Sequence, residues 1–223
     1  MPHTLFQDVQ IIVWDFDGTL YRQKLALWDE IRAGEIRVIM KHTGWSEKKA
    51  SEEFYKVYKV ITPSGTKTVS IIAKISNTAS AIETAAAVDY AKYLKPDARL
   101  AGMFRALSRY RHFMLVNGTQ ESVAKGLKII GLDPSTFEKI VTSEVVGETK
   151  PSEKGFRYIM KETGLPAGAH MMIGDREPVD LVPAHILGMR TCLVWSETTG
   201  KVADVTLPTV YEVADMLGYM KRT

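Results

Sequence analysis

The sequence has few cysteines and no long hydrophobic run. Cys192 is the only cysteine among 223 residues, which excludes an intrachain disulfide, and its apolar neighbours predict a small buried thiol. No stretch approaches about 18 uninterrupted apolar residues, because the best candidate, residues 69–94, is broken by charged and polar side chains. The first residues lack the basic and then apolar pattern of a secretion signal. We therefore expect a cytoplasmic protein that does not associate with membranes.

The sequence also has little net charge and few recognisable ligand patterns. The formal charge is +3, and the basic residues are dispersed among acidic ones, as at Lys48 and Lys49, which does not favour a nucleic-acid-binding surface. A glycine-rich phosphate loop is absent, and the five histidines show no metal-ligand spacing. The apolar fraction of 45% is that of an ordinary globular protein long enough to bury a sizeable core. The sequence does not indicate an oligomeric state.

Two kinds of hydrophobic periodicity follow one another along the chain. From residue 22 to about 95 the spacing is helical, and it predicts one helix ending at Gly44, a second capped by Ser46 and a third running unbroken from Ile72 to Tyr93. These apolar stripes are sufficient for a small helical bundle with its own core. The first unit of secondary structure, residues 11–14, precedes this stretch and reads as a buried strand.

After about residue 97, short apolar strands alternate with amphipathic helices. This alternation predicts an α/β fold in which helices cover both faces of a parallel sheet, that is, a Rossmann-like doubly wound sheet. The expected core domain comprises residues 1–21 and 96–223, interrupted by a helical insertion at 22–95. The strands are expected at 11–14, 113–116, 140–141, 171–173 and 191–195, and the helices of this part at 100–110, 121–130, 152–162 and 179–187.

Two carboxylates follow the first strand directly. In the stretch IIVWDFDGTL, alternation places Asp15 and Asp17 on one side and Phe16 on the other. Two like charges this close repel each other, so the arrangement is costly unless a cation lies between them or they take part in chemistry. Helix capping alone would explain an isolated aspartate, but it does not explain this pair after four apolar residues.

Other polar residues follow the later strands in the same way. Asn117, Gly118 and Thr119 follow the second strand, Asp175 and Asp180 follow a later one, and Lys150 follows the loop 143–149. The carboxyl ends of parallel strands lie at one edge of a sheet, so these groups should converge there. Several carboxylates and one ammonium around a shared point suit a hard divalent cation such as Mg²⁺.

Together these motifs resemble those of the haloacid dehalogenase-like superfamily of hydrolases, and the resemblance covers nearly the whole chain. The family's first motif, Asp-X-Asp-X-Thr, is matched by residues 15–20 (DFDGTL). The lysine of its third motif is matched by Lys150 in residues 147–151 (GETKP), and its fourth motif by residues 174–180 (GDREPVD). The insertion at 22–95 corresponds in position and size to the helical cap of the family, and we refer to it as the cap.

The resemblance implies a role for each of these residues. Asp15 would be the nucleophile that forms an aspartyl-phosphate, and Asp17 the general acid and then base. The presence of Asp17 implies phosphoryl transfer, since the dehalogenase branch lacks an aspartate there. Magnesium would be held by the carboxylates of Asp15 and Asp175 and the main-chain carbonyl of Asp17. Asp180 would act beside the metal, through a bound water or by orienting Lys150, which would offset negative charge.

The second motif departs from the family pattern. A Ser or Thr normally ends the second strand and donates its hydroxyl to the phosphate, but counting back from Gly131 places Val116 there. Asn117, through its amide or its main-chain N–H, is expected to replace that donor, with Gly118 contributing an N–H and Thr119 in support. Either the backbone binds the phosphate, or the Asn117 side chain reaches it.

The sequence therefore predicts a magnesium-dependent phosphatase that acts on a small phosphorylated metabolite. A phosphomutase acting on a sugar phosphate is an alternative, because nothing in the cap separates the two reactions. A weakly active binding or regulatory protein with the same fold is a third interpretation, favoured only by Val116. The residues Tyr21, Arg22 and Lys24, where the chain leaves the core for the cap, fit either a hinge or a substrate contact.

Overall fold

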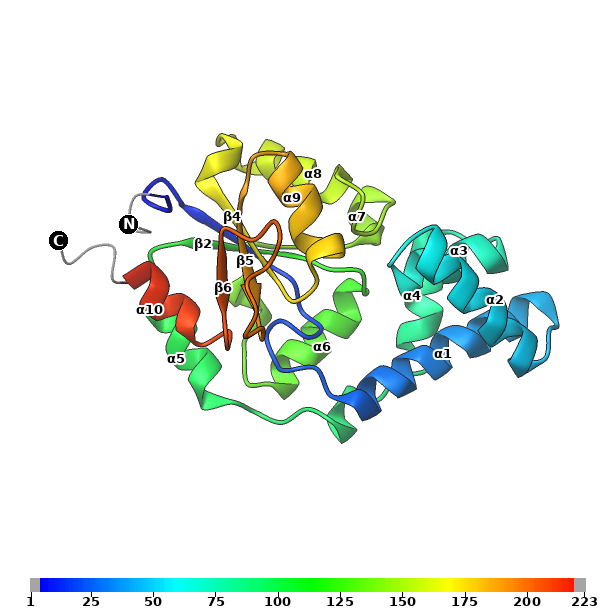
Figure 1. Ribbon diagram of the computed structural model, residues 1–223. Helices are drawn as coiled ribbons and strands as arrows, with labels where there is room; N and C mark the ends of the chain where they lie inside the picture. Colours follow the sequence, from blue (N-terminus) through cyan, green and yellow to red (C-terminus); the bar gives the residue numbers. More distant parts are fainter. Residues whose placement is uncertain (1–4, 219–223) are drawn as a thin grey trace.

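The computed structural model describes residues 5–218 of the chain (Figure 1). Residues 1–4, on which the expectation about a secretion signal rests, lie outside this range. Within it, no helix has both the length and the apolar character needed to cross a membrane. The strands are β1 (Ile11–Trp14), β2 (Arg111–Leu115), β3 (Lys139–Val141), β4 (His170–Gly174), β5 (Arg190–Val194) and β6 (Val205–Leu207).

These six strands form one sheet in the order β3-β2-β1-β4-β5-β6, and every neighbouring pair is parallel. Strand β1 lies at the centre, pairing with β2 on one side and β4 on the other. The direction of winding reverses at β1, which is where open α/β sheets bind ligands. The fold therefore confirms the predicted doubly wound parallel sheet and places the end of β1 at its crevice.

Helices cover both faces of the sheet (Figure 1). Alternate residues of β1 enter different cores: Ile12 and Trp14 pack with helices α5, α6 and α10, whereas Ile11 and Val13 pack with α8 and α9. Cys192 is buried in β5, as its apolar neighbours predicted. The core helices are α5 (Ala98–Ala106), α6 (Gln120–Ile129), α7 (Ser143–Val146), α8 (Lys154–Thr163), α9 (Val182–Ile186) and α10 (Glu212–Gly218), and a π-helical turn spans Glu177–Leu181.

The cap forms a separate group of helices beside the carboxyl edge of the sheet (Figure 1). Its elements are α1 (Leu25–Thr43), α2 (Glu47–Val60), α3 (Gly65–Ala73), α4 (Asn77–Ala85) and a short 3₁₀ turn at Tyr90–Lys92. These helices enclose their own apolar cluster around Ile39, Phe54 and Val69. Helix α1 ends at the C-cap Gly44 and helix α2 begins after the N-cap Ser46, as predicted. The domain limits at 21/22 and 95/96 remain predictions.

The single third helix expected from Ile72 to Tyr93 is wrong, because the chain breaks it twice. Lys74 ends α3 in the left-handed conformation (φ 55°), and the Ser76 hydroxyl accepts a hydrogen bond from Ala79 N and begins α4. Continuous apolar spacing hid this break and the second one, which follows the end of α4 at Ala85. The short elements α7, β6 and α10 were also not predicted; a strand of three residues at a sheet edge leaves little periodicity to detect.

Helix α6 packs unusually close to the loop that follows β1. A Cβ atom built on Gly126 would lie 2.5 Å from Cζ of Phe16, so only glycine leaves room for that ring. Phe16 is buried and stands between Asp15 and Asp17 in the sequence. The contact therefore fixes the position of the residue that spaces the two carboxylates.

Gly126→Ala should destabilise the protein by about 1 to 3 kcal/mol, because the methyl group overpacks the Phe16 ring. Gly102→Ala is the matched control, since Gly102 also lies inside a helix but has only one atom, 3.9 Å away, near the added Cβ. That change should stabilise the protein by about 0.5 to 1 kcal/mol. Urea denaturation measures both; equal effects at the two glycines would contradict the close-packing argument.

Candidate active site

The turn after β1 presents Asp15 at the centre of the crevice. The main-chain N–H of Asp15 continues the sheet by donating to Ile173 O at 3.0 Å, and the side chain is buried. The Thr19 hydroxyl donates to Oδ2 of Asp15 at 2.9 Å. Gly18 adopts φ 87° and passes so close to Asp175 that a Cβ would lie 2.4 Å from its Oδ2. The motif therefore needs glycine both for its backbone conformation and for space.

Lys150 connects two of the predicted site carboxylates. Its buried ammonium Nζ lies 2.7 Å from Oδ1 of Asp15 and 2.7 Å from Oδ1 of Asp180. Burial alone would lower the pKa of Lys150, but the charges of Asp15 and Asp180 outweigh it and raise that pKa. The lysine is therefore a fixed positive charge. Asp180 is held in turn by the main-chain N–H of Arg176, which donates to its Oδ2 at 3.1 Å.

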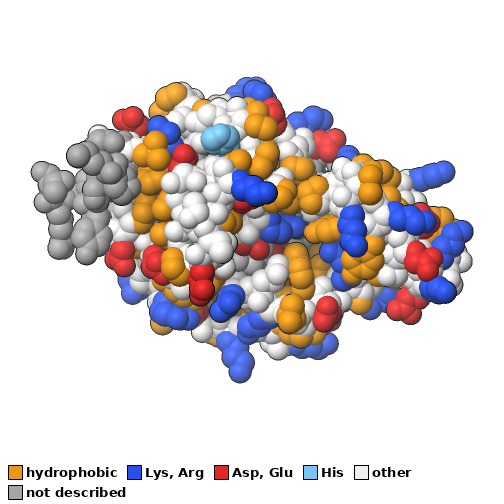
Figure 2. All heavy atoms as spheres, in the orientation of Figure 1, with side chains coloured by type: hydrophobic (Ala, Val, Ile, Leu, Met, Phe, Trp, Pro, Cys, Tyr) orange, Lys and Arg blue, Asp and Glu red, His pale blue; other side chains and the backbone are white. Residues whose placement is uncertain are grey.

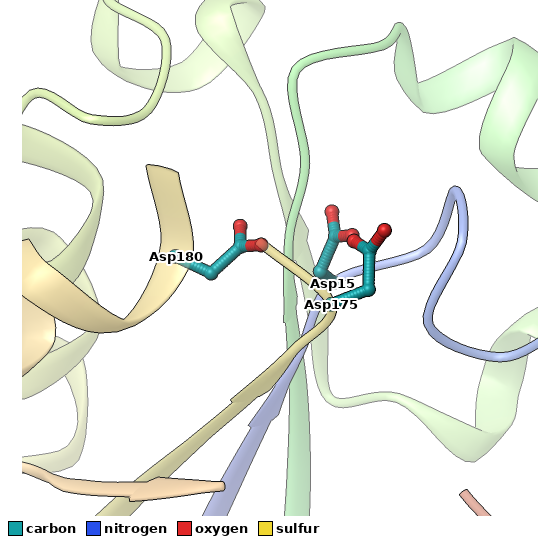
Figure 3. A group of neighbouring side chains, drawn as sticks. All are labelled: Asp15, Asp175 and Asp180. Atoms are coloured by element: carbon teal, nitrogen blue, oxygen red, sulfur yellow. The ribbon is translucent and has the colours of Figure 1, made fainter. Parts of the chain in front are cut away.

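Asp15, Asp175 and Asp180 gather at one point (Figure 3). Each offers a carboxylate oxygen, and these oxygens all lie within 4.8 Å of one another. Oδ1 of Asp175 is buried and has no hydrogen-bond partner among residues 5–218. Burial, together with the Asp15 and Asp180 charges, raises the pKa of Asp175 well above its ordinary value. An orphaned oxygen in an all-carboxylate set fits a hard divalent cation.

Asp17 lies beside this group but faces two tyrosines. The Tyr21 hydroxyl donates a short hydrogen bond to Oδ1 of Asp17, and the Tyr90 hydroxyl approaches Oδ2 at 3.5 Å. Burial raises the pKa of Asp17 to about 6; the Tyr21 hydrogen bond lowers it, and the Asp15 charge raises it further. Tyr21 and Tyr90 stand on the two segments that join the core to the cap, so both connections reach the same carboxylate.

The turn after β2 carries the residues of the second motif, and their side chains point in different directions. Val116 is buried among the apolar residues of the core, and its N–H donates to Val141 O at 3.0 Å. The Asn117 side-chain amide forms hydrogen bonds with both the main-chain N–H and the main-chain carbonyl of Lys150. The Thr119 hydroxyl caps α6 by accepting from Ser122 N at 3.0 Å. The predicted phosphate contacts of Asn117, Gly118 and Thr119 stay predictions, but the side chains of Asn117 and Thr119 already have partners.

A small cavity of about 90 Å³ lies between these groups and the cap. Asp15 and Asp17 line its core side, while Trp28, Arg32 and Glu35 line its cap side. Arg32 forms an ion pair with Glu35 (Nη1 to Oε2, 2.5 Å) and stacks over the rings of Phe54 and Tyr58. The cavity therefore combines a reactive wall of carboxylates with a polar wall supplied by helix α1.

Arg176, next to Asp175, reaches from the core toward the cap. Its Nη1 lies 3.5 Å from Pro63 O, and its guanidinium stands 5.7 Å from the Trp28 ring. Arg176 also lines a wider groove of about 670 Å³ that includes Trp195. The guanidinium thus stands between the inner cavity and the groove that opens beside it.

The structure brings together Asp15, Lys150, Asp175 and Asp180 as the strand-end argument expected, with Asp17 adjacent. The cap side chains Arg32 and Glu35 were not predicted from the sequence, because a charged residue in an amphipathic helix normally faces solvent. Arg176 was not predicted either, although its place directly after Asp175 was a usable signal. Charges of both signs are interspersed on the visible face of the molecule (Figure 2).

Comparison with known proteins identifies a hydrolase family and a related phosphatase. The family model for haloacid dehalogenase-like hydrolase matches residues 9–188. The glyceraldehyde 3-phosphate phosphatase of Methanocaldococcus jannaschii is 31% identical over 98 residues, and this match spans only 42% of each of the two chains.

Two solved structures share the fold over nearly their whole lengths. A HAD phosphatase from Thermococcus onnurineus superposes with TM-score 0.64 at 19% identity, covering 94% of this chain and 98% of the other. The putative HAD-hydrolase YfnB from Bacillus subtilis, whose structure was solved bound to magnesium, superposes with TM-score 0.62 at 16% identity, covering 94% and 98%. At these identities the likeness concerns the fold.

Glu35 should make stability depend on pH. Burial raises its pKa from 4.5 to about 7, although Arg32 opposes the shift. Between these values the folded state binds more protons than the unfolded one, so stability falls as pH rises. Glu35→Gln removes this loss, and its stability relative to the parent should rise by about 2 to 3 kcal/mol from pH 5 to pH 8.

Urea denaturation at both pH values measures this difference. Glu52→Gln, which changes an exposed glutamate of the same cap, is the matched control for the substitution itself. A Glu35→Gln difference that is the same at pH 5 and pH 8 would show that Glu35 is not held in this way.

Proposed function

Because the chain belongs to the haloacid dehalogenase-like hydrolases, we propose that it is a magnesium-dependent phosphatase acting on a small phosphomonoester. The observation that carries the proposal is the pair Asp15 and Asp17, with Lys150 on the first carboxylate and two tyrosines on the second. One carboxylate forms an ion pair with an ammonium, and the other, with a pKa of about 6, can give up a proton. This division of labour suits a nucleophile and a general acid.

The reaction follows from these two environments. A carboxylate oxygen of Asp15 attacks phosphorus, forming an aspartyl-phosphate while the bond to the leaving alcohol breaks. Asp17 gives its proton to the leaving oxygen and then takes a proton from the water that attacks the phosphoryl group. Phosphate is released, Asp15 regains its carboxylate and Asp17 is again protonated. Throughout, Lys150 keeps positive charge beside Asp15.

The carboxylates of Asp15 and Asp175, with the main-chain carbonyl of Asp17, are proposed to hold Mg²⁺, and Asp180 to act beside it. A bound Mg²⁺ supplies positive charge between the nucleophile and the phosphate. The orphaned oxygen of Asp175 supports this assignment, as does the magnesium reported with the Bacillus subtilis structure. Both oxygens of Asp180 already have partners: Oδ1 accepts from Lys150 Nζ and Oδ2 from the main-chain N–H of Arg176. Asp180 is therefore assigned a role beside the metal.

The substrate is proposed to be a cytoplasmic metabolite of only a few carbons. The small cavity of about 90 Å³ between Asp17 and the cap supports a small leaving group. The relative from Methanocaldococcus jannaschii is named for a three-carbon phosphate, which belongs to the same size class. Weak activity is the second candidate, because Val116 is buried in the core and provides no hydroxyl to the phosphate.

The parent enzyme should release p-nitrophenol from p-nitrophenyl phosphate in the presence of Mg²⁺. Asp15→Asn should reduce turnover to the background of the assay, because the nucleophile is gone. Asp17→Asn should slow it by about 100- to 10,000-fold, because the base that activates water against the aspartyl-phosphate is lost. Asp29→Asn, an exposed position on the cap, is the control and should match the parent. Comparable activity of Asp15→Asn and the parent would refute the mechanism.

Metal dependence has a separate readout. Chelation should abolish turnover and added Mg²⁺ should restore it. Calorimetric titration should show Mg²⁺ binding to the parent and a loss of at least about tenfold in affinity for Asp175→Asn, since a charged ligand becomes neutral. Asp29→Asn again serves as the control. Full turnover after exhaustive chelation, or unchanged Mg²⁺ affinity in Asp175→Asn, would contradict the assigned metal site.

A further inference from the structure

The Lys150 peptide is held on both sides by one amide. The N–H of Lys150 donates to Oδ1 of Asn117 at 2.7 Å, and Nδ2 of Asn117 donates to Lys150 O at 2.9 Å. This two-point contact joins the turn after β2 to the loop that carries the buried ammonium. The side chain of Lys150, whose Nζ lies between Asp15 and Asp180, starts from this peptide.

Asn117 is itself held by the cap. Its Nδ2 also donates to Oγ of Ser64 at 3.1 Å, and the Thr66 hydroxyl donates to the main-chain oxygen of Asn117 at 3.1 Å. Ser64, which is buried at the start of α3, also lies 3.3 Å from the Thr149 hydroxyl beside Lys150. Both hydrogens of the Asn117 amide are therefore engaged, one with the core and one with the cap.

We propose that Asn117 is a positioning residue for Lys150, and that the cap hydroxyls of Ser64 and Thr66 complete this positioning. The inference rests on the proposed function for its kinetic consequence, but its geometric part concerns only the Lys150 peptide. It assigns the Asn117 side chain to the lysine loop; a phosphate at this turn would be met by main-chain N–H groups. The cap thus contributes to the catalytic charge arrangement as well as enclosing the leaving group.

The cap offers a matched pair of threonines for the test. Thr66 and Thr78 are both half-buried, and each donates its hydroxyl to a core carbonyl at 3.1 Å: Thr66 to Asn117 O, and Thr78 to Ser143 O. Valine has nearly the same shape as threonine, and the substitution replaces the hydroxyl with a methyl group that cannot donate a hydrogen bond. Thr66→Val therefore breaks a cap–core hydrogen bond on Asn117, whereas Thr78→Val breaks an equivalent one elsewhere.

The first readout needs no activity. In protein labelled with ¹⁵N-lysine, the Lys150 amide signal is identified by its disappearance in Lys150→Arg, and its hydrogen exchange is measured without substrate. Thr66→Val should speed this exchange by about fivefold or more, the effect of weakening one hydrogen bond. Thr78→Val should stay within about twofold of the parent. Equal exchange rates in the two variants would overturn the proposal.

The second readout is kinetic. Thr66→Val should lower kcat on p-nitrophenyl phosphate about fivefold with little change in KM, while Thr78→Val leaves both near the parent values. Asn117→Ala should lower kcat further, by about 100-fold. A rise in KM for Asn117→Ala with kcat unchanged would instead show direct phosphate binding by the amide and overturn the proposal. If the parent shows no turnover, the phosphatase assignment fails, and the exchange result alone decides the role of Asn117.

Discussion

The ammonium of Lys150 between Asp15 and Asp180 is the interaction on which the rest of the site depends. A buried aspartate needs a positive neighbour, all the more in the proposed attack on an anionic phosphate, and Lys150 supplies one from 2.7 Å. The same ammonium also donates to Asp180, and this second contact fixes the position of Nζ independently of Asp15. Asp175 is left with an unpaired oxygen, so the negative charge that remains is concentrated where a cation would bind.

The glycines around Asp15, Asp175 and Asp180 allow neighbouring segments to pack closely. Gly18 lets the turn after β1 reach Asp175, and a Cβ on Gly174 would lie 2.5 Å from Cβ of Asp180. Gly126 leaves room for Phe16, the residue between the two aspartates in the sequence. Strand β1 lies between β2 and β4, so the loops from three strands meet without long connections. The amide of Asn117 joins one of these loops to Lys150 and to the cap.

The sequence was sufficient for the parts governed by local pattern and strand order. Apolar runs ending in polar residues located strands β1 to β5 and missed only β6 among the described residues. Parallel pairing then implied that Asp15, Lys150, Asp175 and Asp180 would converge. The contacts of Tyr90 with Asp17 and of Asn117 with Ser64 could not be predicted in this way. They depend on how the cap docks, which joins residues more than 50 positions apart, such as Ser64 and Asn117, and leaves no periodic trace. The break at Lys74 was missed because a left-handed residue does not interrupt apolar spacing.

The separate apolar cluster of the cap has a consequence for how such a protein can change. Because Ile39, Phe54 and Val69 pack among themselves, the cap can accept new cavity-lining side chains without repacking the sheet. Its freedom is bounded at α3, where Ser64 and Thr66 meet Asn117. Recombination that exchanged whole caps between relatives would replace the cavity-lining side chains Arg32 and Glu35, yet the incoming segment would have to restore two hydroxyls at the start of α3. It would also have to keep the Tyr90 hydroxyl that approaches Asp17, so the exchange is constrained at two places: the start of α3 and the last turn of the cap.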